Sequence, residues 1–320
     1  MTEAAPALQV PAQSVPIPST ISPQAQGFLA FATQRNAARG DAPVDMDAGA
    51  QAALAMLRPR AEGFAGELET IDLGNGASLY RITPANRPAE RREVAYLDIH
   101  GGGFVTGGGE MCRILAQLRA IELGVEVWAV DYRLAPEHPY PAALDDCLAA
   151  YRHVLGKVTA DKLVVAGGSA GGNLAAALLL RARDEGLPLP AGLILMTPVT
   201  DMTGAGDTRV TNRYLDVTLN GGGDVLALYC GNGDPQHPYL SPVLGSFAES
   251  WPPTLLSSGT RDLLLSDTVR MHRVLRRAGV RAELHVTEAG PHGGFMGSAP
   301  EDHELIAECR RFCEEAWGLA

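Results

Sequence analysis

Residues 163–172 read Leu-Val-Val-Ala-Gly-Gly-Ser-Ala-Gly-Gly, and a segment rich in alanine and leucine follows to about Asp184. The apolar run 163–166 is typical of a buried strand, and the alanine- and leucine-rich segment is typical of a helix. Ser169 therefore stands at a turn between strand and helix, within a Gly-x-Ser-x-Gly pattern. Such a turn is tight and strained, so it needs small neighbours. This context indicates a nucleophile at Ser169 rather than a packing turn.

Strands and helices alternate on both sides of this turn. Eight strands are predicted, at 67–73, 77–83, 94–100, 125–130, 163–166, 193–196, 254–257 and 282–287. The first two form a hairpin turned at Asn75-Gly76. Further helices are predicted at 110–123, 142–155, 268–278 and 301–316. Regular alternation of short apolar strands with helices predicts a mostly parallel sheet with helices on both faces.

Two segments depart from this alternation. Residues 1–26 are rich in Pro, Ala, Ser and Gln and are predicted to form an irregular lead-in, whereas 27–62 has apolar residues at helical spacing. Residues 201–235 contain seven glycines and few apolar runs. We interpret the first segment as an appendage that precedes the sheet and the second as an insertion into it.

The composition excludes several classes of protein. Of the 320 residues, 46% are hydrophobic and 20% are charged, which is typical of a globular chain. The net charge of -11 argues against binding to nucleic acid or to anionic membrane surfaces. The longest apolar run, 174–180, is far shorter than the roughly 20 residues that span a bilayer. No Lys or Arg precedes Arg35, so a signal peptide is not expected.

The cysteines predict a reducing environment. Five cysteines, an odd number, are spread through the chain, which favours free thiols and a cytoplasmic location. Cys309 and Cys313 lie four residues apart on a predicted helix without a partner pair at zinc spacing. We expect two semi-buried thiols there and no metal site.

A second glycine-rich motif, His-Gly-Gly-Gly-Phe at 100–104, ends another predicted strand. Glycines let the backbone approach a ligand and aim amide groups at it, as the oxyanion of a tetrahedral intermediate requires. The candidate donors are the amides of Gly102, Gly103 and Ala170. A flexible loop or a phosphate cradle is the alternative. The spacings typical of nucleotide binding are absent, which disfavours the cradle.

A nucleophilic serine needs a base and an acid that orients the base. When the serine stands on such a turn, the chain order is serine, acid, histidine. Of the eight histidines, His292 is favoured because it lies in a loop just after a predicted strand. Asp262 follows another strand and is the favoured acid. Asp267 is the rival, but it lies at a predicted helix start, where it would interact with the helix dipole.

Together these motifs resemble a known family. Residues 131–143 read Asp-Tyr-Arg-Leu-Ala-Pro-Glu-His-Pro-Tyr-Pro-Ala-Ala, between the motif at 100–104 and the Ser169 turn. This long segment is similar to the hormone-sensitive-lipase-type esterases of the α/β-hydrolase fold. The resemblance runs from about residue 65 to the C-terminus. Segments 259–267 and 291–295 also resemble the bacterial branch, which includes lactone- and acetyl-ester-hydrolysing members.

The resemblance implies a fold, a site and an activity. The fold is an α/β-hydrolase domain at 63–320, with an eight-stranded, mostly parallel sheet flanked by helices. A helical cap would be formed by 1–62 and by the insertion 201–235. Ser169 would be the nucleophile, Asp262 the acid and His292 the base, with oxyanion donors at Gly102, Gly103 and Ala170. The activity would be hydrolysis of small to medium acyl esters through an acyl-enzyme, without metal or organic cofactor.

Two positions depart from the family pattern. An acidic residue usually precedes the nucleophile, where this chain has Gly168, and the family often reads His-Gly-Phe after the base, where Gly294 intervenes before Phe295. Lactonase, deacetylase, amidase and thioesterase activities would use the same triad and stay open. A non-catalytic binder on this fold should lack part of the triad. Related families form homodimers through the sheet edge or the cap, and the sequence does not demand one here.

Overall fold

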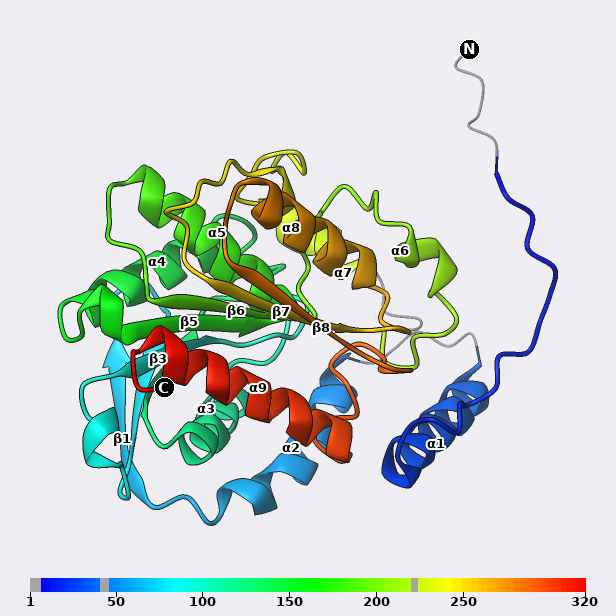
Figure 1. Ribbon diagram of the computed structural model, residues 1–320, viewed down its shortest axis with the longest axis horizontal. Helices are drawn as coiled ribbons and strands as arrows, with labels where there is room; N and C mark the ends of the chain where they lie inside the picture. Colours follow the sequence, from blue (N-terminus) through cyan, green and yellow to red (C-terminus); the bar gives the residue numbers. More distant parts are fainter. Residues whose placement is uncertain (1–6, 41–45, 220–223) are drawn as a thin grey trace.

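One sheet of eight strands organises the protein, whose computed structural model describes residues 7–40, 46–219 and 224–320 (Figure 1). The strand order is β1-β2-β4-β3-β5-β6-β7-β8. β2 is antiparallel to both of its neighbours, and all other pairs are parallel. The strands are β1 (Gly66–Asp72), β2 (Ser78–Pro84), β3 (Ala95–Ile99), β4 (Glu126–Asp131), β5 (Leu163–Gly168), β6 (Gly192–Met196), β7 (Thr254–Gly259) and β8 (Ala282–Thr287).

Helices cover both faces of this sheet, so the predicted fold class is confirmed. In Figure 1, α4, α5 and α8 lie on one face and α3 and α9 on the other. The α-helices are α1 (Pro23–Arg39), α2 (Met46–Ala61), α3 (Glu110–Leu123), α4 (Ala142–Leu155), α5 (Ala170–Asp184), α6 (Thr208–Thr211), α7 (Val225–Cys230), α8 (Leu265–Arg277) and α9 (Pro300–Ala316). Because helices cover both faces of a parallel sheet, the side chains on both faces are buried. Both faces of the sheet are therefore apolar.

The N-terminal region differs from the prediction. The irregular lead-in was expected to extend to residue 26, but α1 begins at Pro23. The Ser22 side chain accepts a hydrogen bond from the Ala25 amide, and proline suits the first turn because it has no amide hydrogen to satisfy. The predicted helical segment 27–62 covers most of α1 and all of α2. Residues 1–6 and 41–45 lie outside the described residues.

The cysteines are free and buried. No disulfide joins any of the five, which agrees with the expectation of free thiols. Cys309 and Cys313 were expected to be semi-buried, but they are 5% and 0% exposed. Their spacing of four residues places both on the face of α9 that packs against the sheet. Within the described ranges, no helix combines the length and apolar character needed to cross a membrane.

The N-terminal region and the insertion 201–235 are in contact with each other. The side chains of Arg35 and Asn36, near the end of α1, both donate hydrogen bonds to the carbonyl of Val217. The start of α1 is attached elsewhere, because the Ser22 amide and hydroxyl donate to the carboxylate of Glu301 on α9. Residues 220–223, within the insertion, lie outside the described residues.

Candidate active site

Ser169 stands on a strained turn between β5 and α5. Its φ of 54° and ψ of -116° lie in a region that non-glycine residues rarely adopt. Hydrogen bonds hold it there: the Ser169 amide donates to Met196 O at 2.9 Å, and its carbonyl accepts from the Val199 amide at 3.1 Å. The neighbouring chain therefore maintains the strain, which is typical of functional sites.

The glycines around this turn are required by close backbone contacts. A Cβ on Gly167 would lie 2.2 Å from Gly171 O, and one on Gly171 would lie 2.0 Å from Ile99 O. Gly168 is different, since a Cβ there would meet only Met196 O, at 3.8 Å. The position where the related family usually has an acidic residue therefore has room for a side chain.

The structure brings the three predicted polar side chains together. Ser169 Oγ lies 2.9 Å from His292 Nε2, and His292 Nδ1 lies 3.1 Å from Asp262 Oδ1. Ser169 follows β5, Asp262 follows β7, and His292 follows β8. Because these strands are parallel, their carboxyl ends meet at one edge of the sheet. The arrangement matches a nucleophile, a base and an acid in hydrogen-bonding sequence.

The neighbours of Asp262 favour its ionised form. Its Oδ1 accepts from the Leu264 amide at 2.9 Å, and its Oδ2 accepts from Ser258 Oγ at 2.7 Å. Burial disfavours the carboxylate, but the charge of His292 and these hydrogen bonds outweigh burial and lower the pKa of Asp262. For His292, burial lowers the pKa, but the charge and hydrogen bond of Asp262 and the charge of Asp216 outweigh it and raise the pKa.

Asp267, the rival acid, lies elsewhere in the network. It is buried at the first turn of α8, and its Oδ2 accepts from the amides of Thr200 and Asp201 and from Arg209 Nη2, at 2.9 to 3.1 Å. It makes no hydrogen bond to His292 in the described structure. Asp267 therefore joins α8 to the insertion, while Asp262 contacts the imidazole.

The glycine loop after β3 lies against the serine turn. A Cβ on Gly101 would lie 3.0 Å from Gly168 O and 3.4 Å from Ser169 Cβ. Gly102 and Gly103 have φ of 113° and 61°, and their amides donate to no other residue among those described. Ala170 is the first residue of α5, so its amide has no acceptor within the helix. The amides of Gly102 and Gly103 are thus without an acceptor among the described residues, and the Ala170 amide has none within its helix.

Two residues that sequence reasoning missed support this loop. Tyr132 Oη donates to His100 O at 2.9 Å, and the two rings stack at 4.1 Å. Asp131 accepts from the Gly109 amide and from Tyr80 Oη, each at 2.9 Å. Both belong to the 131–143 segment that carried the family resemblance, and that segment was the available signal.

One cluster of three side chains among the described residues consists of types that can bind a metal ion. Candidate ligand atoms of His100, Cys112 and Asp131 all lie within 4.8 Å of one another. Burial raises the pKa of the Cys112 thiol well above its usual range, which favours the protonated form over the thiolate that binds metals. Asp131 already accepts two hydrogen bonds within the loop support. The group therefore belongs to the packing behind the glycine loop.

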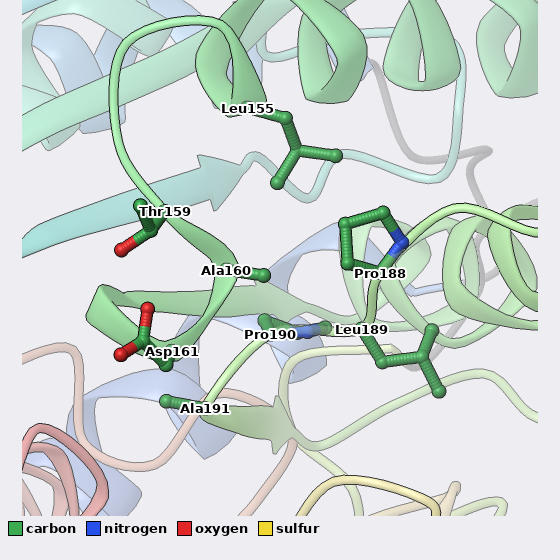
Figure 2. Close-up of a pocket in the computed structure, with 8 residues that line it drawn as sticks. All are labelled: Leu155, Thr159, Ala160, Asp161, Pro188, Leu189, Pro190 and Ala191. Carbon is green, nitrogen blue, oxygen red and sulfur yellow. The ribbon is translucent and has the colours of Figure 1, made fainter.

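A hollow of about 610 Å³ lies away from Ser169 (Figure 2). Leu155, Pro188 and Leu189 line it together with residues 159–161 and 190–191. Residues 159–161 and 190–191 immediately precede β5 and β6, whereas Ser169 follows the other end of β5. The hollow is therefore at the opposite edge of the sheet from Ser169 and does not serve the serine.

Comparison with known proteins identifies the family. A family model for the alpha/beta hydrolase fold matches residues 96–296. The chain is 34% identical to an acetyl-hydrolase of Streptomyces hygroscopicus over 205 residues, which are 63% of this chain and 67% of that protein. The crystal structure of esterase E25 superposes with a TM-score of 0.86 at 31% identity, over 97% of this chain and 98% of that chain.

A further structure places the chain within a branch of this fold. An esterase from the bacterial hormone-sensitive lipase family superposes with a TM-score of 0.80 at 30% identity, over 93% of this chain and 99% of that chain. In both comparisons the structural similarity extends along nearly the whole length of each chain. The chain belongs to the α/β-hydrolase fold family and, within it, to the hormone-sensitive-lipase-type bacterial esterases.

Proposed function

We propose that this chain is a serine carboxylester hydrolase that cleaves small to medium acyl esters. One observation carries the proposal: Ser169 Oγ, His292 and Asp262 form a continuous hydrogen-bonded series of 2.9 and 3.1 Å at the edge of the sheet. The relatives named esterase and acetyl-hydrolase support the same reaction class. A non-catalytic binding protein would not need these three side chains to be hydrogen-bonded in series.

In the proposed mechanism, Ser169 Oγ attacks the ester carbonyl while His292 Nε2 takes the hydroxyl proton. Asp262 accepts the hydrogen bond of His292 Nδ1–H, fixes this tautomer and stabilises the imidazolium. His292 then returns the proton to the departing alcohol, which leaves an acyl group on Ser169. Water activated by the same imidazole releases the acid and restores the hydroxyl.

The amides of Gly102, Gly103 and Ala170 are proposed as the donors to the oxyanion. Two observations support this assignment. Gly101 contacts the serine turn, and the amides of Gly102 and Gly103 have no acceptor among the described residues. Preorganised backbone donors require no reorganisation when charge develops on the carbonyl oxygen. Loss of one such donor costs about 10²–10³ in turnover.

A cap over this site is proposed from residues 1–62 and 201–235, with the catalytic domain at 63–320. The bonds from Arg35 and Asn36 to Val217 O connect the two segments. The insertion also reaches the glycine loop, since a Cβ on Gly103 would lie 3.1 Å from Val225 Cγ2. Such a cap would bound the acyl pocket and so limit the length of the substrate.

A cytoplasmic location is proposed from the cysteines. All five are free and buried, which is typical of chains kept in a reducing compartment.

The function is tested by hydrolysis of p-nitrophenyl esters of increasing acyl length by the wild-type protein and by Ser169→Ala. The wild type is expected to hydrolyse esters of small to medium acyl groups, and the variant to lose on the order of 10⁶ in kcat. Circular dichroism of both proteins controls for folding. Equal activity of the two proteins would refute the nucleophile, and lactone and amide substrates in the same assay separate the alternative activities.

A further inference from the structure

A second buried carboxylate lies beside the proposed triad. Asp216 belongs to the insertion 201–235 and is 0% exposed. None of the ion pairs formed by the described residues includes it. An unpaired buried carboxylate costs considerable free energy unless hydrogen bonds compensate it. Because no ion pair compensates its charge, the carboxylate of Asp216 needs hydrogen bonds from the groups around it.

Backbone amides from three segments surround this carboxylate. Oδ1 accepts from the amides of Thr218 and Leu219, at 2.9 and 3.1 Å, in its own turn. Oδ2 accepts from the Leu263 amide at 2.8 Å. Oδ1 also lies 3.4 Å from the amide nitrogen of His292, in a longer hydrogen bond. One side chain from the insertion thus holds the loop after β7 and the loop after β8.

These two loops carry the acid and the base. Leu263 directly follows Asp262, so the bond to its amide fixes the backbone from which the acid extends. The bond to His292 reaches the backbone of the base itself. The two loops also bond to each other directly, since the Arg261 amide donates to Gly290 O at 3.0 Å and the Ala289 amide donates to Thr260 Oγ1 at 2.7 Å. Asp216 adds bonds next to the acid and at the base itself.

Charge adds to this geometry. Asp262 and Asp216 both favour the protonated imidazole of His292, whereas Arg209 opposes it. Arg209 is itself paired with Asp267 at 2.9 Å. Burial raises the pKa of Asp216 above its usual value, and the charge of His292 and the Leu263 and Thr218 amides oppose this rise. Proton transfer from Ser169 makes the imidazole positive, which favours the Asp216 anion further, so this anion is more favourable in the transition state than before it.

We propose that Asp216 is a positioning residue that couples the insertion to the triad: it fixes the acid and base loops relative to one another and stabilises the imidazolium. This role rests on the proposed function. Asp216 touches neither the substrate nor the reacting atoms. It acts through Asp262 and His292.

The test compares Asp216→Ala and Asp216→Asn with a matched control, Asp201→Asn. Asp201 is also 0% exposed and lies in the same insertion, but it bonds to Thr203 and pairs with Arg270. Misplacement of a catalytic group by about 1 Å costs on the order of 10²-fold in rate. We expect Asp216→Ala to lower kcat by about this factor with little change in KM, and Asp216→Asn to lower it less.

The pH profile separates this role from a general loss of stability. Both Asp216 variants remove the anion, so the acid limb of the kcat/KM profile should move to lower pH as the pKa of His292 falls. Asp201→Asn should leave that limb in place. If Asp216→Ala fails to fold, Asp216→Asn alone decides. A wild-type kcat and an unmoved limb in Asp216→Asn would overturn the proposal.

Proton NMR gives a readout that needs no turnover. The hydrogen between His292 Nδ1 and Asp262 should give a low-field resonance in the wild type and in Asp201→Asn, and it should shift or broaden in both Asp216 variants. An unchanged resonance in those variants would contradict the proposal. If the wild type hydrolysed no ester, the proposed function would fail, while this comparison would still decide the role of Asp216.

Discussion

Ser169 shows how local strain and hydrogen bonding combine at a single residue. A non-glycine residue in this region of φ and ψ costs about 1–3 kcal/mol. The bonds to Met196 O and from the Val199 amide keep it there, which aims Oγ at His292 Nε2. The folded protein carries this backbone strain before any substrate binds. Ser169 therefore needs no rearrangement before it attacks.

The acid is assigned by comparing two buried aspartates. Asp262→Asn should lower kcat by up to about 10⁴, because the amide favours the wrong tautomer of His292. Asp267→Asn should chiefly lower stability, since Asp267 holds Arg209 and the insertion. Steady-state kinetics with urea unfolding of each variant makes the comparison. A larger loss of kcat in Asp267→Asn than in Asp262→Asn would transfer the role.

The pH dependence follows from the neighbours of His292. Asp262 and Asp216 raise the pKa of its imidazole despite its burial. Only the neutral imidazole accepts the serine proton, so activity should fall as pH drops through this raised pKa. The midpoint of the acid limb of kcat/KM should therefore lie above the ordinary value of about 6.5. A profile that stays flat down to pH ~5, with chemistry rate-limiting, would contradict the assignment of the base.

At the scale of elements, the packing of the β5–α5 turn against the sheet depends on particular glycines. Gly171→Ala would place a Cβ 2.0 Å from Ile99 O on β3, while Gly168→Ala meets only Met196 O at 3.8 Å. The first change should destabilise the protein by at least the 1–3 kcal/mol typical of overpacking, and the second by well under 1 kcal/mol. Urea denaturation of the pair measures the difference. Equal destabilisation would show that the turn is not sterically limited as described.

Most elements were predictable because their signals are local. Runs of apolar residues and the glycines after them gave the strands, and apolar spacing gave α3, α4 and α9 close to their observed ends. The start of α1 was missed because Ser22, its N-cap, lies in a proline-rich segment. α6 and α7 span four and six residues, too few to show a helical period.

The site was predictable only in part, for a related reason. Ser169, Asp262 and His292 follow predicted strands, and parallel strands bring such positions to one edge. Asp216 and Tyr132 act through backbone amides and carbonyls of segments distant in sequence. Backbone partners leave no residue-type signal, so the contacts of Asp216 emerge only from the folded chain. For Tyr132 the one signal is its place in the 131–143 segment.

At the scale of the whole molecule, the two-sided packing on the sheet encloses every thiol. All five cysteines are buried, and burial raises the pKa of each one. Buried, protonated thiols react slowly. The native protein should therefore be almost inert to a chromogenic disulfide reagent, and the urea-unfolded protein should release five equivalents. Rapid reaction of several thiols in the native protein would contradict the packing of both sheet faces.

The fold as a whole brings the side chains of Ser169 and His292 into contact, although they lie 123 residues apart in the sequence. We infer that this contact makes Ser169 a nucleophile. Labelling with a serine-directed organophosphate, followed by peptide mass mapping, tests it most directly. We predict one adduct, on Ser169, with loss of ester hydrolysis in proportion to labelling. An adduct on another residue, or full labelling without loss of hydrolysis, would contradict the account.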